Sequence, residues 1–214
     1  MLRLLLCSAD DDGVVMDWKI IKTNGYKEID GTRLDLSHLQ DTTYRFSIEA
    51  SGKFPQIDFN VLVQYSSHCI SWGPKRDEVI DFDLHGHERR VIDDKGVHRC
   101  FCDARYELSS NLPGVFETLI DRQCLFTGHE NWLTVEILNS NGETEEYEVF
   151  FSITRQSSRM LRIYVESAYV REPEKVTNKP VHLKRRDKVR AKVLLAKKLR
   201  GEPIRRPTGG RKRR

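Results

Sequence analysis

Three neighbouring segments decide the fold: residues 132–138 (WLTVEIL), 147–155 (YEVFFSITR) and 160–170 (MLRIYVESAYV). In each of them apolar and polar side chains alternate, which is the pattern of a β-strand with one face on a core. The Asn-Gly pair at 141–142 suits the positive φ angles of a tight hairpin turn, and residues 156–158 (QSS) supply a second turn. The sequence therefore predicts a three-stranded antiparallel meander.

The segments before the meander complete the expected fold. Residues 112–123 (LPGVFETLIDRQ) carry apolar side chains at helical spacing, with a proline that the first turn of a helix tolerates. Residues 44–50 (YRFSIEA) and 59–65 (FNVLVQY) predict two strands, and residues 79–82 and 97–102 predict short ones. We therefore expect an α+β fold, with an antiparallel sheet, the C-terminal meander and one clear helix in the body.

Charge is distributed unevenly along the chain. Residues 171–214 hold 18 of the 36 Lys and Arg but 4 of the 32 Asp and Glu, a net charge of +14, and the preceding residues carry −10. We predict a disordered leader over 1–15, an acidic globular domain over 16–173 and a basic tail over 174–214. A basic tail binds polyanions through counterion release. The alternative is that it only keeps the chain soluble or folds back onto the acidic domain.

The tail has some helical character of its own. Residues 187–200 (DKVRAKVLLAKKLR) predict a helix capped by Asp187 and ended by Gly201, and the prolines and glycines beyond predict a disordered end. Two arginines of the meander join the tail as candidate contacts to nucleic acid. These candidate nucleic-acid-binding residues are Arg155, Arg162, Lys184, Arg185, Arg186, Arg190, Lys197, Lys198, Arg205, Arg206, Arg211, Lys212, Arg213 and Arg214.

Several features bear on the compartment. No apolar run approaches the roughly 18 residues of a membrane span, and residues 1–7 (MLRLLLC) hold one positive charge and an apolar run too short for an export signal. The chain holds five cysteines, an odd number, which favours reduced thiols in a reducing compartment. We expect a cytoplasmic protein with no membrane partner.

Metal and thiol chemistry have little support in the sequence. Cys100 and Cys102 are separated by one residue, as are His85 and His87, whereas zinc sites usually use two cysteines separated by two residues. We predict structural cysteines, no metal ion and no cofactor. The alternatives are a zinc site or a nucleophilic Cys69, which would need a histidine brought close by the fold.

A polar cluster between the helix and the first meander strand is the candidate acid–base group. His129 lies in residues 127–131 (TGHEN), where a carboxylate can fix the tautomer of an imidazole base. Such residues also favour turns and helix caps, so a purely structural role is the alternative.

The last strand supplies further candidates. Counting by twos places Ser167 and Tyr169 on the same face as Ile163 and Val165, toward the open edge of the sheet. In an up-down-up meander the start of the first strand and the end of the third share one end of the sheet, so His129 would lie near them. Phosphate would then be held by an arginine of the preceding segment, Arg99 or Arg105, whereas Arg155 and Arg162 fall toward the opposite end. The alternative is an ordinary solvated sheet face.

Four short strings carry a family resemblance: residues 65–69 (YSSHC), 102–106 (CDARY), 128–132 (GHENW) and 165–169 (VESAY). Over about residues 16–173 the chain resembles bacterial proteins of plasmids, prophages and genomic islands labelled "stationary phase growth adaptation protein" or "heat shock protein C". The resemblance implies a protein of a mobile element and assigns no catalytic residue.

A second resemblance is one of architecture. A helix followed by a meander with Arg, Ser and Tyr on its last strands is similar to the barnase–EndoU–colicin–RelE group of metal-independent ribonucleases. That resemblance implies cleavage by the RNA's own 2′-hydroxyl, with His129 as the base and Arg155 or Arg162 steadying the phosphorane. The acidic body departs from the basic character that small toxins of this group often have.

The leading hypothesis from the sequence is a protein that acts on RNA, as a metal-independent, toxin-like ribonuclease. The first alternative is a non-enzymatic stress or adaptation factor that binds nucleic acid or the ribosome. The second is a protein-interaction component of a phage-defence or toxin–antitoxin system. Incubation of the protein with RNA in EDTA separates cleavage from binding, and a nuclease-resistant pull-down identifies a protein partner.

Overall fold

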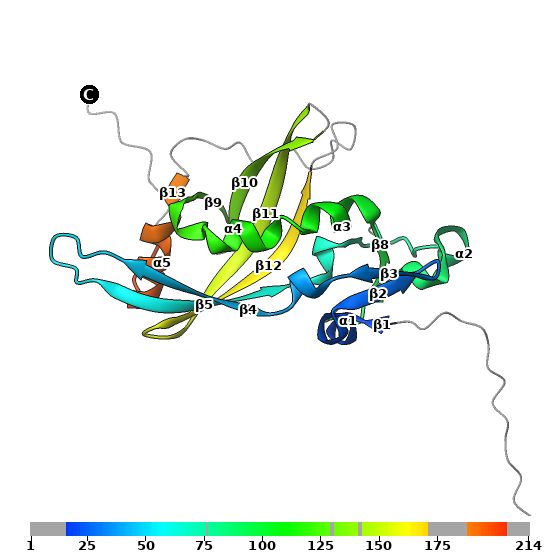
Figure 1. Ribbon diagram of the computed structural model, residues 1–214, viewed down its shortest axis with the longest axis horizontal. Coiled ribbons are helices and arrows are strands. Elements are labelled where there is room, and N and C mark those ends of the chain that lie inside the picture. The colour runs from blue at the N-terminus through cyan, green and yellow to red at the C-terminus, as the bar shows by residue number, and fades with distance from the viewer. Residues whose placement is uncertain (1–15, 76, 129–130, 141–142, 171–187, 205–214) are drawn as a thin grey trace, which may run out of the picture.

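The computed structural model describes residues 16–75, 77–128, 131–140, 143–170 and 188–204, and its largest element is a seven-stranded sheet (Figure 1). Adjacent strands of this sheet are antiparallel, except that β12 and β5 run parallel. The strand order is β13 (Lys188–Arg190), β9 (Gln123–Gly128), β10 (Asn131–Ser140), β11 (Glu143–Ser157), β12 (Met160–Val170), β5 (Ile57–Tyr65) and β4 (Thr42–Ile48). The predicted α+β class and the antiparallel meander β10–β11–β12 are confirmed.

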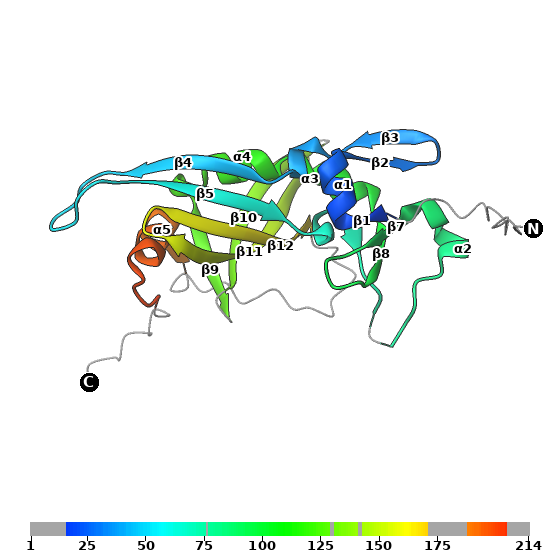
Figure 2. The same ribbon diagram turned by 90° about the horizontal axis from the view of Figure 1, so that it is seen from below.

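Two smaller sheets lie at one end of the molecule, away from α5 (Ala191–Arg200) at the other end (Figures 1 and 2). One has the order β1 (Met16–Asp17), β7 (Arg90–Ile92), β8 (His98–Phe101) and β6 (Ser71–Trp72). The other is the hairpin of β2 (Tyr26–Ile29) and β3 (Thr32–Asp35). β8 confirms the strand expected within residues 97–102.

The remaining elements are short helices. They are α1 (Trp18–Asn24), α2 (Phe82–His85), α3 (Asp103–Ser109) and α4 (Leu112–Glu117), with single turns η1 (Ser37–Leu39), η2 (Ser67–Cys69), η3 (His87–Arg89) and η4 (Leu119–Asp121). α4 runs across the large sheet, with α3 beside it (Figure 1). None of the helices in these ranges has the length and apolar character needed to cross a membrane.

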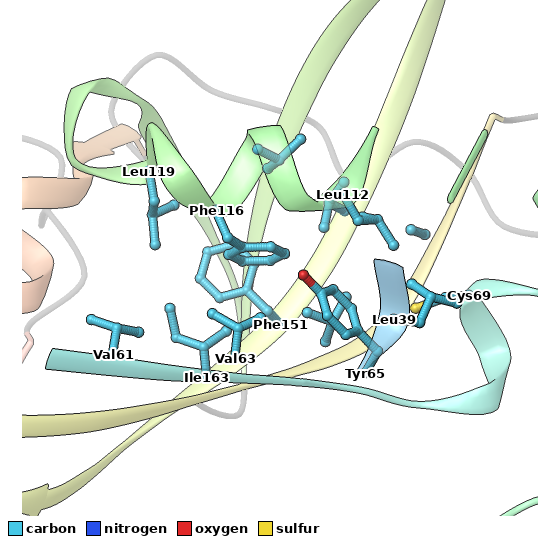
Figure 3. Packing of buried hydrophobic residues seen from close by; sticks show 14 of the residues in the cluster. Leu39, Val61, Val63, Tyr65, Cys69, Leu112, Phe116, Leu119, Phe151 and Ile163 are labelled. Atoms are coloured by element: carbon cyan, nitrogen blue, oxygen red, sulfur yellow. The ribbon is translucent and has the colours of Figure 1, made fainter. Parts of the chain in front are cut away.

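The core lies between α4 and the large sheet (Figure 3). The Phe116 ring meets the edges of Tyr65 and Phe151, with ring centroids 6.1 and 5.8 Å apart. Val61 and Val63 on β5 and the alternate residues of β12 extend this layer. The alternation that predicted the strands therefore corresponds to one buried face of the sheet.

Two sequence expectations about secondary structure are wrong. The helix expected over 112–123 ends at Glu117, because the backbone leaves helical geometry at Thr118, and Gln123 already belongs to β9. Residues 79–82 form no strand. Asp81 instead caps α2, since its carboxylate accepts hydrogen bonds from the backbone N–H groups of Asp83 and Leu84.

The segment beyond the meander is partly integrated into the core. β13 pairs with β9, and of the helix expected over 187–200 only residues 191–200 are helical, as α5, which Gly201 ends in the left-handed conformation. Residues 188–190 form β13 instead, so the expected start of the helix is wrong. Leu194, Leu195 and Leu199 are at most 3% exposed and belong to the main core cluster. The boundary at residue 173 is therefore not the limit of the core, because residues 188–204 complete it. The remaining parts of the expected tail, and the expected leader, lie outside the described residues.

A β-bulge in β12 changes which side chains face the core. Phe150 of β11 lies opposite Ser167, but Phe151 lies opposite Val165, so Glu166 is an extra residue in β12. After the bulge Ala168 is the buried residue, and Ser167 and Tyr169 turn to the outer face. The expectation that both continue the Ile163–Val165 face is therefore wrong, because one extra residue reverses the alternation.

Candidate functional site

The bulge opens beside a cleft of about 390 Å³ on the outer face of the sheet. We call it the bulge cleft. Its walls come from η2, from the turn after β7 and from β12. The residues that line it are Ser66, Ser67, His68, Asp93, Asp94, Lys95, Tyr164, Glu166 and Ser167.

His68 and Asp93 form the acid–base pair of this cleft. His68 Nε2 lies 3.6 Å from Asp93 Oδ2, and the His68 side chain is 40% exposed. Burial, together with the charge of Arg99, lowers the pKa of the imidazole despite the attraction of Asp93. His68 is therefore neutral at pH 7 and able to accept a proton.

The Asp93 carboxylate is held by its own turn. Its Oδ1 accepts hydrogen bonds of 2.9 Å from the backbone N–H groups of Lys95 and Val97. Burial alone would raise the pKa of this carboxyl, but the hydrogen bonds from Val97 and Lys95 hold it below its ordinary value. Asp93 is therefore a carboxylate fixed beside the imidazole.

Arg99 and Arg105 lie beneath η2 and brace it. Arg99 donates from Nε to Ser71 Oγ at 2.9 Å and from Nη2 to the Ser71 carbonyl at 3.2 Å. Arg105 Nη1 donates to the carbonyls of His68 and Ser71 at 2.9 and 2.7 Å. Burial lowers the pKa of Arg99 to about 10, so this side chain remains cationic at pH 7. Arg105 holds the His68 backbone directly, and Arg99 holds Ser71, which follows η2.

The bulge and η2 are tied together by Ser66. Its hydroxyl donates to the Glu166 carbonyl at 2.6 Å and accepts from the His68 N–H at 3.2 Å. Tyr164 OH donates to Asp94 Oδ2 at 3.0 Å across the cleft. Ser67 Oγ is buried and has no hydrogen-bond partner among the described residues. The cleft thus combines a fixed acid–base pair with hydroxyl groups.

The structure brings together part of the predicted catalytic set. Ser167 lines the cleft, and Arg99 and Arg105 lie beneath η2, where they brace it. Tyr169 lies next to Arg105, with the guanidinium carbon 5.3 Å from its ring centroid. His129 is outside the described residues.

The two meander arginines do not share one face. Arg162 lies on the outer face beside Tyr164, and its Nε donates to Gln64 Oε1 at 2.5 Å. Arg155 pairs across the ladder with the buried Leu161, so it lies on the core face. At about 3.3 Å per residue, Arg155 is roughly 20 Å from Ser167 along β12. Arg155 and Arg162 therefore lie on opposite faces of the meander.

Sequence reasoning missed His68, Asp93 and Tyr164 as members of one site. His68 is not among the residues predicted from the sequence, and it lies in the single turn η2. Residues 65–69 contain His68 and are one of the strings that carry the family resemblance, so this string was the indication of His68 in the sequence. The Asp93–Gly96 turn carried no comparable signal.

Basic side chains gather at the other end of the molecule, around α5. A pocket of about 670 Å³ includes Arg155 and Lys198, and a neighbouring groove includes Lys192, Lys197 and Arg200. Arg190 is exposed at the start of α5. The candidates that lie outside the described residues are Lys184, Arg185, Arg186, Arg205, Arg206, Arg211, Lys212, Arg213 and Arg214.

The described cysteines are separate thiols. Cys69, Cys100 and Cys124 are buried, Cys102 is half-buried, and none of the four forms a disulfide among the described residues. Burial raises the pKa of Cys69 to about 12, so it is not a thiolate nucleophile at pH 7. In the part of the chain that the structure describes, no group of three or more His, Cys, Asp or Glu side chains is arranged to hold a metal ion.

Comparison with known proteins gives one match. No curated protein and no solved structure matches the chain. A family model matches residues 26–199, which run from β2 into the last turn of α5 and contain both the bulge cleft and the basic end. The chain belongs to the YjaZ family.

Proposed function

We propose that this protein acts on RNA and cleaves it in the bulge cleft without a metal ion. The observation that carries the proposal is the pair of a neutral His68 and an anionic Asp93, 3.6 Å apart at the edge of a cleft. A histidine whose tautomer is fixed by a carboxylate is a suitable general base at neutral pH. His68 takes the role of base that was predicted for His129.

The reaction is an internal transfer of the phosphate. His68 accepts the proton of the 2′-hydroxyl as the 2′ oxygen forms a bond to phosphorus, and the bond from phosphorus to the 5′ oxygen breaks. The Lys95 ammonium, which also lines the cleft, faces the developing negative charge and gives a proton to the leaving 5′ oxygen. The products are a 2′,3′-cyclic phosphate and a 5′-hydroxyl.

The charges around the cleft are compatible with a phosphate. Asp93 and Asp94 are each engaged, the first by the backbone of its turn and by His68, the second by Tyr164. Arg99 and Arg105 offset these carboxylates from beneath η2. Glu166 is a third carboxylate at the wall of the cleft, and Lys95 is the cation there that would receive a single phosphodiester.

Incubation with a fluorescent single-stranded RNA in EDTA tests the proposal. The wild-type protein should produce fragments that end in a cyclic phosphate, and His68→Ala should reduce the rate by at least about 100-fold, as loss of a general base does. His98→Ala is the matched control, because His98 is exposed on β8 and does not line the cleft. Equal rates for wild type and His68→Ala would refute the assignment.

A second candidate function is RNA binding without cleavage, which the cations around α5 favour. It predicts a salt-dependent gel shift in EDTA with intact RNA. The resemblance to growth-adaptation proteins of mobile elements supports a role for either activity in a cytoplasmic stress response. A partner protein in a defence or toxin–antitoxin system stays a prediction, since no described surface favours it.

A further inference from the structure

A second pocket, on the core face of the sheet, has a composition unlike that of the bulge cleft. It has a volume of about 670 Å³, which is in the range of small-molecule sites. Phe126, Trp132, Arg155 and the turn after α5 line it, and we call it the Arg155 pocket. It combines two aromatic rings with cationic side chains, and the proposed reaction uses none of them.

The aromatic wall is fixed. Phe126 and Trp132 come from the neighbouring strands β9 and β10, and their ring centroids are 5.3 Å apart. Trp132 is 1% exposed, whereas Phe126 is half-buried. Phe126 therefore offers ring surface to a ligand while Trp132 holds that ring in place.

The cationic wall is also held in position. Arg155 is exposed, and no hydrogen bond or ion pair to its guanidinium occurs among the described residues. A Cβ atom at Gly201 would lie 3.6 Å from Arg155 Nη1, so the guanidinium lies beside the C-terminal end of α5. The partial negative charge of a helix C-terminus favours a cation there. Glu202 also lines the pocket, but its carboxylate is paired with Arg200 at 2.5 Å.

Trp132 carries one further unsatisfied group. Its indole Nε1 is buried and has no acceptor in the described part of the chain. Buried donors are almost always paired in folded proteins, so such a group marks a place where an acceptor from outside the chain would be favourable. The carbonyl oxygens of nucleobases are acceptors of this kind.

We propose that the Arg155 pocket binds one nucleotide of single-stranded RNA, with the base packed on Phe126 and its phosphate paired with Arg155. Stacking of a base on an aromatic ring next to a basic groove is the usual mode of single-strand recognition. This inference rests on the proposed action on RNA, since it names where the substrate is held. Arg155 and Ser167 lie roughly 20 Å apart along β12 and on opposite faces of the sheet, so an RNA that occupied both sites would have to pass around the end of the strands.

The test uses an RNA that cannot be cleaved, so that binding is separated from catalysis. The probe is a fluorescent 2′-O-methyl hexauridylate, whose blocked 2′ oxygen cannot attack phosphorus, and the competitor is polyphosphate of equal charge. Arg155→Gln should weaken binding about tenfold. Arg159→Gln, which removes an exposed arginine of the adjacent turn that does not line the pocket, should change it by less than twofold. Phe126→Leu should reduce the preference for the oligonucleotide over polyphosphate.

A second measurement, NMR of the indole N–H groups, observes the Arg155 pocket directly. The chain has three tryptophans, so three indole N–H signals are expected by NMR, and loss of one in Trp132→Phe assigns it. That signal should shift on addition of the oligonucleotide and stay unchanged with polyphosphate. Equal losses in Arg155→Gln and Arg159→Gln, or displacement by polyphosphate at equal concentration, would mean a diffuse basic surface and overturn the proposal. His68→Ala should bind the oligonucleotide as the wild type does. The binding result can therefore be interpreted even if the protein does not cleave RNA.

Discussion

The bulge cleft and the Arg155 pocket lie on opposite faces of one sheet, and they differ in how their polar groups are satisfied. In the cleft, Asp93, Arg99 and Arg105 are bound by backbone groups of their own surroundings. In the Arg155 pocket, the Arg155 guanidinium and the Trp132 indole have no partner among the described residues. The first arrangement fixes a base and tunes its pKa, whereas the second leaves donors available to a ligand.

The two regions also differ in which part of the chain supplies their side chains. The cleft is built from the acidic body, and the cations around the Arg155 pocket come largely from the segment after the meander. Because that segment enters the same core as β11 and β12, the two regions are parts of one folded unit. Removal of the segment that holds β13 and α5 should therefore disrupt the bulge cleft as well.

Truncation tests this claim and has the largest expected effect. A chain that stops after residue 187 loses β13 and the buried leucines of α5, and we expect no cooperative thermal unfolding by circular dichroism. A chain that stops after Ile204 keeps every described contact of α5 and should unfold cooperatively. If the shorter chain also unfolds cooperatively, the two regions are independent and the comparison fails.

A matched pair of substitutions in α5 measures how much the buried face of this helix contributes to the free energy of unfolding. Leu195 is 0% exposed and Val193 is 42% exposed. Leu195→Ala should lower the free energy of unfolding by about 2–5 kcal/mol, as for other buried leucines. Val193→Ala should change it by about 0.5 kcal/mol or less. Similar losses in urea denaturation for both variants would contradict the burial of this helix face.

The third change acts on the cleft alone. Asp93→Asn removes the charge that accepts two backbone hydrogen bonds, so we expect a loss of about 1–3 kcal/mol at pH 7. Because the pKa of Asp93 is lowered in the folded state, the stabilisation is present above the unfolded value of about 3.9 and is lost as pH falls through the folded value. Urea titrations at pH 7 and pH 3 measure the difference, which should be smaller at pH 3.

The same variant sharpens the comparison of the two regions. Binding of the 2′-O-methyl oligonucleotide to Asp93→Asn should equal that of the wild type, because the Arg155 pocket lies on the other face of the sheet. A parallel loss of oligonucleotide binding and of stability would show that the regions are coupled.

The sequence predicted the meander, because strict alternation records one buried face, and it predicted the end of α5 at Gly201 but not its start, which lies at Ala191 and not after Asp187. It did not predict the bulge at Glu166, since one extra residue leaves the composition of β12 unchanged and only the pairing with β11 reveals it. The burial of α5 was missed for a related reason. A helix rich in lysine resembles a solvated one until its leucine face is seen against the sheet.

The candidate site shows the same limit. Ser167, Arg99 and Arg105 were named from the sequence, but the cleft needs His68 and Asp93, which are 25 residues apart in the chain and meet only through the fold of η2 and the turn after β7. Local patterns identify side chains suited to chemistry, and tertiary contacts decide which of them meet.

The smallest effect on stability is expected at His68, and its sign is diagnostic. Burial and Arg99 lower the pKa of the folded imidazole, so below about pH 6.5 the unfolded chain binds a proton that the folded chain resists. Wild-type stability should therefore fall relative to His68→Gln as pH decreases from 7 to 5, and the two should run parallel above pH 7. The cleavage rate should follow the same group, rising with pH through a midpoint below 6.5, because the neutral imidazole is the base. Urea titrations and initial rates across this range give both curves. A rate midpoint above 7, or a wild-type stability that rises relative to His68→Gln as pH falls, would mean that the Asp93 charge outweighs burial and that the imidazole is cationic in the cleft. His68 would then be a phosphate-binding group and not a base.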